Sequence, residues 1–142
     1  MRVLLDTNVV IAAFAARGLC SEVFEVCLSE HTIVTSLHIL EEVKEKLRIK
    51  LRLPLHVVDG IISYLTSVSE IVQPTGPFPS VCRDEDDDMV IAAAVEGHAC
   101  VIITGDNDLL VLKKHGKIKI ASPRDFWELL RKGGTGKSTT TA

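Results

Sequence analysis

The chain has 142 residues, 46% of them hydrophobic, which is enough for one hydrophobic core and too few for two domains of ordinary size. The formal net charge of -3 provides no overall positive potential, so a nucleic acid would have to be held by local basic groups or by metal ions. No apolar run is long enough for a membrane helix and the first residues do not form a signal peptide, so we expect a cytoplasmic protein without membrane contacts.

Five short apolar runs without polar alternation predict the buried strands of a parallel sheet. They are residues 3–5, 32–34, 71–72, 100–103 and 118–120. Helical patterns cover residues 9–16, 21–29, 37–48, 57–67, 87–96, 106–112 and 123–131. Ser36 and Ser122 are candidate N-caps, and Gly97 is a candidate helix end. Strands that alternate with helices predict a doubly wound α/β fold.

Two segments are expected to lie outside this regular pattern. Residues 73–79 contain three prolines and one glycine, so they predict a loop, which lies directly before an acidic cluster. The last residues, GGTGKSTTTA, contain no apolar side chain able to anchor them. We therefore expect a folded domain over residues 1–132 and a disordered tail over residues 133–142.

Carboxylates follow two of the predicted strands. Asp6 comes directly after the first strand, and Asp106 stands near the end of the strand VIIT. Ligands of open α/β sheets bind at the carboxyl ends of the strands, near the point where the strand order reverses. We therefore expect both carboxylates to point toward one rim of the sheet.

A third acidic group, Asp84 with residues 86–88, opens a helix. Asp88 is spaced three and four residues from Ile91 and Ala92, which places it on the side of the helix turned toward the core. Acids in a first turn also complement the helix dipole, and for one or two of these aspartates this is the simpler explanation. Helix capping does not explain why Asp6 and Asp106, which follow strands, occur together with these aspartates.

Several carboxylates in one cleft raise one another's pKa and repel unless a cation neutralises them. Ligand sets made only of oxygen select hard ions such as Mg²⁺ or Mn²⁺. Such ions hold a phosphate and lower the pKa of a bound water, which is the chemistry of phosphodiester hydrolysis. The acidic pattern therefore favours a metal-dependent hydrolase.

Three segments, LLDTNVVIAAF, TSLHILEEV and DEDDDMVIAAAVEGHACVIITGDNDLL, resemble in order and spacing the motifs of the PIN-domain superfamily. The resemblance runs from Met1 to about Leu130 and is closest to the prokaryotic PIN proteins that are toxins of toxin-antitoxin pairs. It implies a three-layer, Rossmann-like α/β/α sandwich with a mostly parallel central sheet. It also implies an endoribonuclease that uses Mg²⁺ or Mn²⁺, an antitoxin protein as partner, and a homodimer.

The resemblance also assigns roles to individual residues. Asp6 would be the first metal ligand, ordered by Asn8. Glu42 fits the second acid because it stands six residues after Ser36, although the apolar stripe of its helix places Glu41 nearer the stripe's centre.

The third acid is Asp88 in one family pattern and Asp87 in a related one, and we rank Asp88 first. Asp106 would complete the cluster, supported by Thr104 and Asp108. The catalytic set is then Asp6, Glu42, Asp88 and Asp106, with Asp87 as a further candidate metal ligand. The motifs leave open whether one or two cations bind.

Two other functions are compatible with parts of the sequence. VLLDTN also resembles the strand and aspartate of phosphatases of the haloacid-dehalogenase type, but those enzymes need a second aspartate where this chain has Asn8. A PIN-like module that binds RNA or protein without cleaving it is the other alternative, and the four filled acid positions argue against it.

Remaining polar residues leave less specific signals. The basic run with Lys44, Lys46, Arg48, Lys50 and Arg52 fits either contacts to substrate phosphates or a solvated helix end. The five histidines follow no metal-ligand spacing and are expected to be structural or exposed. The four cysteines form no CxxC pair, which argues against zinc and disulfides. The RNA target is not encoded in any of these motifs.

Overall fold

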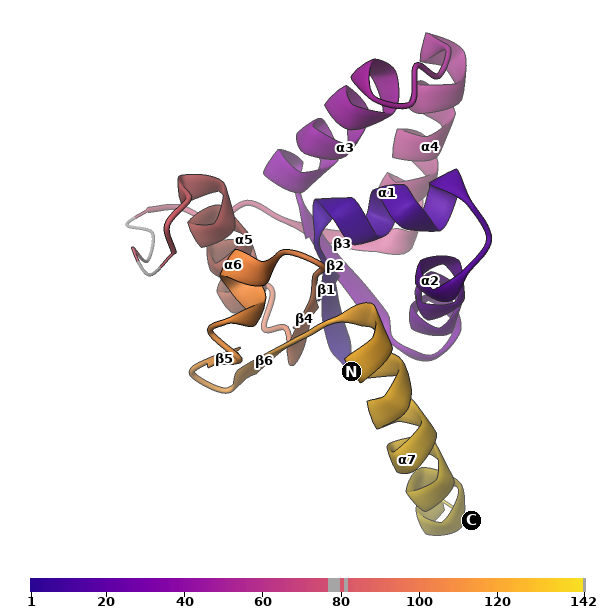
Figure 1. Cartoon of the computed structure of the whole chain (residues 1–142), viewed down its shortest axis with the longest axis vertical. Coiled ribbons are helices and arrows are strands. Elements are labelled where there is room, and N and C mark those ends of the chain that lie inside the picture. Colours follow the sequence, from indigo (N-terminus) through magenta and orange to yellow (C-terminus); the bar gives the residue numbers. More distant parts are fainter. Residues whose placement is uncertain (77–79, 81, 142) are drawn as a thin grey trace.

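The computed structural model describes residues 1–76, 80 and 82–141, with side chains up to residue 132 (Figure 1). Its centre is a six-stranded sheet with the order β3-β2-β1-β4-β6-β5. The strands are β1 (Arg2–Leu5), β2 (Thr32–Ser36), β3 (Ser69–Val72), β4 (Val101–Ile103), β5 (Lys114–His115) and β6 (Ile118–Ala121). All neighbouring pairs are parallel except β5 and β6.

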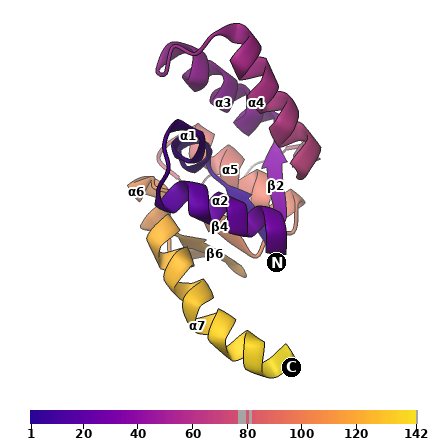
Figure 2. The same ribbon diagram turned by 90° about the vertical axis from the view of Figure 1, so that its right-hand side faces the viewer.

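Helices cover both faces of this sheet. They are α1 (Thr7–Ala15), α2 (Leu19–Glu30), α3 (Leu37–Ile49), α4 (Leu55–Val68), α5 (Glu85–Glu96), α6 (Asn107–Leu110) and α7 (Pro123–Thr141). In Figure 1, α5 and α6 lie to the left of the sheet, and α1, α2 and α7 lie to its right. Figure 2 shows α3 and α4 as a pair beyond the end of β2. The predicted α/β/α sandwich with a mostly parallel sheet is thus confirmed.

The central strands β1 and β4 lack polar alternation because they are buried on both faces. Val3, Leu4 and Leu5 of β1 are at most 1% exposed, although they point alternately to opposite sides of the sheet. Strand β1 has β2 on one side and β4 on the other, and the chain crosses over β1 between β3 and β4. The strand order therefore reverses between β1 and β4, which makes the carboxyl ends of these two strands the expected ligand-binding place.

The caps predicted from the sequence are confirmed. The Ser36 hydroxyl accepts a hydrogen bond from the Ile39 amide at 3.1 Å, and the Ser122 hydroxyl accepts one from the Asp125 amide at 3.0 Å. Gly97 caps the C-terminus of α5, and a methyl group on its Cα would overlap the side chain of Val34. Glycine is therefore needed here for close packing of α5 on β2.

Two elements differ from the sequence prediction. The edge strand β5 was not expected, because its two residues, Lys114 and His115, carry no apolar pattern; the turn to β6 uses Gly116 with φ of 59°. Helix α7 continues past residue 132 to Thr141, where a disordered tail was predicted. The side chains of 133–141 and all of residue 142 lie outside the described part, so the domain boundary at residue 132 stays a prediction.

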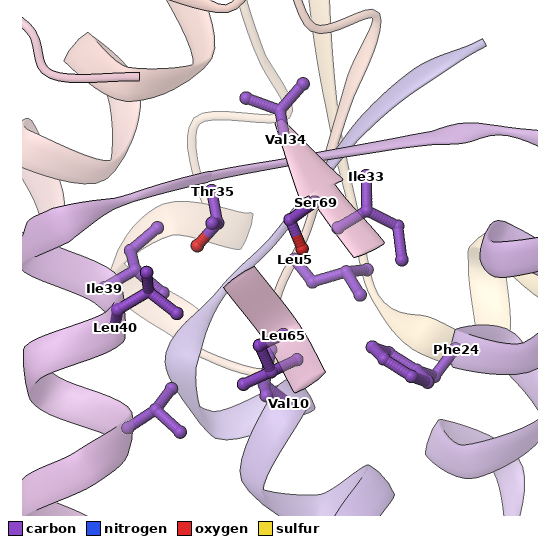
Figure 3. A pocket seen from close by; sticks show the side chains of 11 residues that line it. Leu5, Val10, Phe24, Ile33, Val34, Thr35, Ile39, Leu40, Leu65 and Ser69 are labelled. Carbon is purple, nitrogen blue, oxygen red and sulfur yellow. The ribbon is translucent and has the colours of Figure 1, made fainter. Parts of the chain in front are cut away.

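A small cavity lies in the core between the sheet and helices α1, α2, α3 and α4 (Figure 3). Its lining is apolar apart from Thr35 and Ser69, and its volume of about 10 Å³ is that of a single water-sized probe. It has no charged lining residue among those described, so it is a packing defect and not a site for chemistry. Among the described helices, none has the length and apolar composition that a bilayer crossing requires.

Candidate active site

Asp6 lies at the carboxyl end of β1, where it forms the N-cap of α1. Its Oδ1 accepts a hydrogen bond from the Thr7 amide at 2.8 Å, and its Oδ2 accepts one from the Thr104 hydroxyl at 2.7 Å. The side chain is only 7% exposed. Burial raises the pKa of Asp6, with a smaller contribution from the charge of Asp106, while the hydrogen bond from Thr104 opposes the increase.

Thr104 connects this carboxylate to the corresponding position on the neighbouring strand. Because Leu5 pairs with Ile103 across β1 and β4, the residues that follow the two strands are adjacent. The buried Thr104 hydroxyl donates to Asp6 and also accepts from the Asp106 amide at 3.0 Å. Asp106 in turn caps α6 by accepting from the Asp108 amide. The two strand-end acids therefore meet at one rim of the sheet, as predicted.

The two adjacent aspartates of α5 face different partners. Asp87 and Asp88 are each 7% exposed. Asp88 is turned toward the preceding segment, where its Oδ1 accepts from the Cys82 amide at 2.9 Å. Asp87 is turned toward Asp106, and carboxylate oxygens of Asp87, Asp106 and Asp108 lie within 4.8 Å of one another. The geometry thus brings Asp87, not the first-ranked Asp88, to the strand-end acids.

Glu42 reaches the same region from α3. Its Oε1 accepts a hydrogen bond at 3.0 Å from the hydroxyl of Thr7, the residue that follows Asp6. Glu41, the alternative at this place, is exposed. The position of Glu42 is therefore coupled through Thr7 to the first turn of α1.

These residues surround an open, polar pocket with a volume of about 140 Å³. Its acidic lining consists of Asp6, Glu42, Asp84, Asp86, Asp87 and Asp106. Asn8 and Lys46 also line it, and the Asn8 side-chain oxygen is 3.5 Å from the amide nitrogen of Gly105. Neither Asp88 nor Asp108 is among the described residues that line this pocket.

Asp87 is a buried carboxyl close to other carboxyls. Burial and the neighbouring charge of Asp106 raise the pKa of Asp87 to about 7. Its buried Oδ2 has no hydrogen-bond partner among the described residues. A buried carboxylate oxygen without a donor is costly, and near other carboxylates it requires either a proton or a cation. Oxygen ligands of this kind fit a hard divalent ion such as Mg²⁺ or Mn²⁺.

Comparison with known families identifies the domain. Residues 2–108 match the model of the PIN domain, which is about three quarters of the chain. The chain belongs to the PIN-domain family. Members of this family are nucleases and generally depend on divalent metal ions, and the acidic pocket of this PIN domain is compatible with such an ion. An uncharacterized protein of Methanocaldococcus jannaschii is 37% identical to this chain over an alignment of 146 positions, which covers 93% of each of the two chains.

Solved structures share the fold. VapBC2 from Rickettsia felis, bound to a DNA fragment from their promoter, matches with a TM-score of 0.61 and 15% identity over 86% of this PIN domain and 98% of that chain. VapBC-1 from nontypeable Haemophilus influenzae matches with a TM-score of 0.61 and 16% identity, and the match covers 87% of this chain and 99% of that chain. At this level of identity the comparison establishes the architecture of the PIN domain.

Three polar residues of this pocket region were not singled out as site residues from the sequence. Thr7 follows the predicted ligand Asp6, and its contact with Glu42 depends on how α1 packs against α3. His38 lies one helical turn before Glu42, with its Nε2 at 3.7 Å from Glu42 and 3.2 Å from Asp86. Their spacing of four residues, which places two side chains on the same face of a helix, could have indicated this contact from the sequence. Lys46 lies one turn after Glu42 in the same helix, within the ambiguous basic run.

Proposed function

We propose that this PIN domain is an endoribonuclease that depends on Mg²⁺ or Mn²⁺, with Asp6, Asp87 and Asp106 as its cation ligands. The observation that carries the proposal is the buried Oδ2 of Asp87, which has no donor among the described residues and lies in a pocket that Asp6 and Asp106 also line. A divalent ion would satisfy this oxygen and offset the repulsion that raises the pKa of Asp87. When bound, it would supply Lewis-acid assistance to phosphodiester hydrolysis.

The other residues of the pocket would keep these ligands in place. The Thr104 hydroxyl, bonded on both sides, fixes Asp6 relative to the backbone of Asp106. Glu42, held by Thr7, adds a carboxylate from α3 to the lining of the pocket, where it can orient an attacking water. Asn8 stands at the rim of the pocket, next to Gly105.

Asp88 and Asp108 have more peripheral roles in this proposal. Asp88 anchors the segment before α5 through the Cys82 amide. Asp108 lies close enough to Asp87 and Asp106 to hold a water of the cation's hydration shell. Both residues would support the site without binding the ion directly.

Cleavage assays with adjacent-residue variants test this assignment. Purified protein is incubated with a labelled structured RNA and, separately, with a phosphomonoester, each with Mn²⁺, Mg²⁺ or EDTA. We expect RNA cleavage only with a divalent ion, and a loss of at least about 100-fold in Asp87→Asn, typical for removal of a metal ligand or a partner that supports one. Asp88→Asn is the matched control and should retain cleavage when corrected for the folded fraction.

The other outcomes identify the alternatives. Turnover of the phosphomonoester alone would indicate a phosphatase, and RNA retention without products would indicate a binding module. Cleavage that survives in Asp87→Asn but is lost in well-folded Asp88→Asn would contradict the proposed ligand set.

We further propose that the nuclease is the toxin of a toxin-antitoxin pair and acts in the cytoplasm as a homodimer. The motif resemblance and the fold shared with VapBC proteins support this proposal. Expression of the chain should arrest growth of a bacterial host, and co-expression of the antitoxin from the adjacent reading frame should relieve the arrest. Light scattering of the purified protein should give twice the mass of the 15.5 kDa chain. A monomer, or growth unaffected by an active nuclease, would contradict these points.

A further inference from the structure

A second groove continues from the acidic pocket along α3. Its lining consists of Glu42, Glu45, Lys46, Ile49, Lys50 and Asp86. Three of these residues, Glu42, Lys46 and Asp86, also line the acidic pocket. The two hollows therefore adjoin, and an extended ligand bound at the acids can reach into the groove.

Lys46 of α3 and Lys50, the C-cap residue of that helix, line the same groove. They are four residues apart, so their Cα atoms are separated by about 6 Å along the helix. Neither lysine forms an ion pair with any described residue, although carboxylates line the same groove. Lys46 is close enough to Asp6 for its positive charge to lower the pKa of that carboxyl. Both ammonium groups are therefore available to an external anion.

The neighbouring basic residue of α3 provides a contrast. Lys44 lies near Asp59 of α4, with 3.8 Å between Nζ and Oδ1, and it does not line the groove. Within the basic run, Lys44 thus faces α4, whereas Lys46 and Lys50 face the groove. Ile49, which is 66% exposed, lies between the two groove lysines in sequence and offers an apolar surface to a base or a ribose.

We propose that Lys46 and Lys50 bind successive phosphates of a single-stranded RNA segment on one side of the scissile bond. This rests on the proposed function, since it assigns the path of the substrate from the same acidic pocket. An RNA strand is an extended polyanion with exposed bases, which matches two unpaired ammonium groups and an exposed apolar side chain. The net charge of -3 makes such local contacts necessary, because the chain as a whole does not attract RNA.

The salt dependence of RNA binding tests this path. Fluorescence anisotropy of a labelled single-stranded RNA is measured between about 50 and about 300 mM salt, a range in which counterion release changes the affinity measurably. All binding variants carry Asp87→Asn so that cleavage does not interfere. Lys46→Ala and Lys50→Ala should each reduce the slope of log K against log salt by about 0.7, and each should weaken binding about fivefold at about 0.1 M salt.

Two further variants of α3 are matched controls. Lys44→Ala removes the same charge from outside the groove and should leave the slope unchanged. Glu45→Lys adds a positive charge within the groove and should steepen the slope by about 0.7. In the cleaving protein, Lys50→Ala should raise KM while kcat stays within about twofold, because the contact contributes to substrate binding before the transition state is reached.

The proposal is overturned if both groove-lysine variants bind RNA within twofold of the parent, or if Lys44→Ala weakens binding as much as they do. Stronger lysine-dependent binding to single-stranded DNA of the same sequence would overturn the assignment to RNA. If the unsubstituted protein binds RNA through these lysines and does not cleave it with any divalent ion, the proposed nuclease function fails while the RNA path stands. If the protein cleaves RNA with a divalent ion and neither lysine affects cleavage, the proposed RNA path fails while the nuclease function stands.

Discussion

Replacing Asp87 by asparagine should stabilise the metal-free protein while removing its response to metal. Burial and neighbouring charges raise the pKa of Asp87 from 3.8 to about 7. At about 1.4 kcal/mol per unit, ionising this carboxyl in the folded state costs up to about 4 kcal/mol. Part of this cost comes from the interaction with Asp106. We therefore expect Asp87→Asn to raise the free energy of unfolding by about 2 to 4 kcal/mol at pH 8.

The pH dependence follows from the direction of the shift. Below pH 3.8 the carboxyl is protonated in both folded and unfolded chains, so the substitution changes little. Between pH 3.8 and about 7 the unfolded chain loses the proton while the folded protein keeps it, so the wild type becomes progressively less stable than the variant. Above pH 7 the difference should be constant.

Urea unfolding in EDTA at about pH 4, 5.5, 7 and 8 measures this difference, because these values run from the ordinary pKa of 3.8 to just above the shifted pKa of about 7. A gain of about 3 kcal/mol corresponds to a Tm increase of about 10 °C for a chain of this size. Adding Mn²⁺ should stabilise the wild type and leave Asp87→Asn unchanged. A variant that is less stable than the wild type at pH 8, or a difference that does not depend on pH, would refute the reasoning.

Four other predictions follow from contacts in and around the pocket. Asp88→Ala leaves the Cys82 amide without its acceptor and should lower the free energy of unfolding in urea by about 1 to 3 kcal/mol. The Mn²⁺ affinity, measured by calorimetry, should stay the same, and loss of Mn²⁺ binding would contradict the prediction. Mn²⁺ should bind more tightly as the pH rises from about 5.5 to 7, because the cation competes with the proton on the acidic cluster. The released proton should be detectable from the dependence of the calorimetric heat on the buffer. An affinity that does not depend on pH would argue against a carboxylate site. Thr104→Val removes the hydroxyl between the two strand-end acids and should lower Mn²⁺ affinity about 10- to 100-fold, whereas Thr104→Ser should retain it. Gly97→Ala should lower stability by about 1 to 3 kcal/mol through overlap with Val34, with the activity of the folded fraction unchanged, and an unaffected Tm would show that α5 can shift without cost.

The sequence predicts the positions of Asp6 and Asp106 because their signal is local. Each follows an apolar strand buried on both faces, and parallel strands place their carboxyl ends at the same edge of the sheet. Of the whole sheet order, only the adjacency of β1 and β4 is needed to bring the two acids together.

The choice between Asp87 and Asp88 depends on tertiary structure. Helical periodicity places Asp88 on the core side, and it is buried. Val95 stands seven residues after Asp88, so periodicity places it on the same side of the helix, yet it is 49% exposed. Both aspartates are equally buried and differ only in what lies opposite them: other carboxylates for Asp87, a backbone amide for Asp88. Periodicity reports burial and does not identify the partner.

Glu42 shows a second limit of periodicity. The apolar stripe of α3 favours Glu41, but this residue is exposed because α1 packs against the other flank of the helix. Glu42 is consequently turned toward Thr7. Only the resemblance to PIN-domain motifs indicated Glu42. For a residue at the margin of an apolar stripe, the packing of other elements against the helix decides whether its side chain is buried.

The cation ligands are the central claim, and anomalous diffraction from crystals soaked in Mn²⁺ tests them most directly. The account predicts an anomalous peak in the acidic pocket, with carboxylate oxygens of Asp6, Asp87 and Asp106 at about 2.2 Å and no contact from Asp88. A peak coordinated by Asp88 instead of Asp87, or an empty pocket in crystals of a protein that cleaves RNA in EDTA, would contradict it.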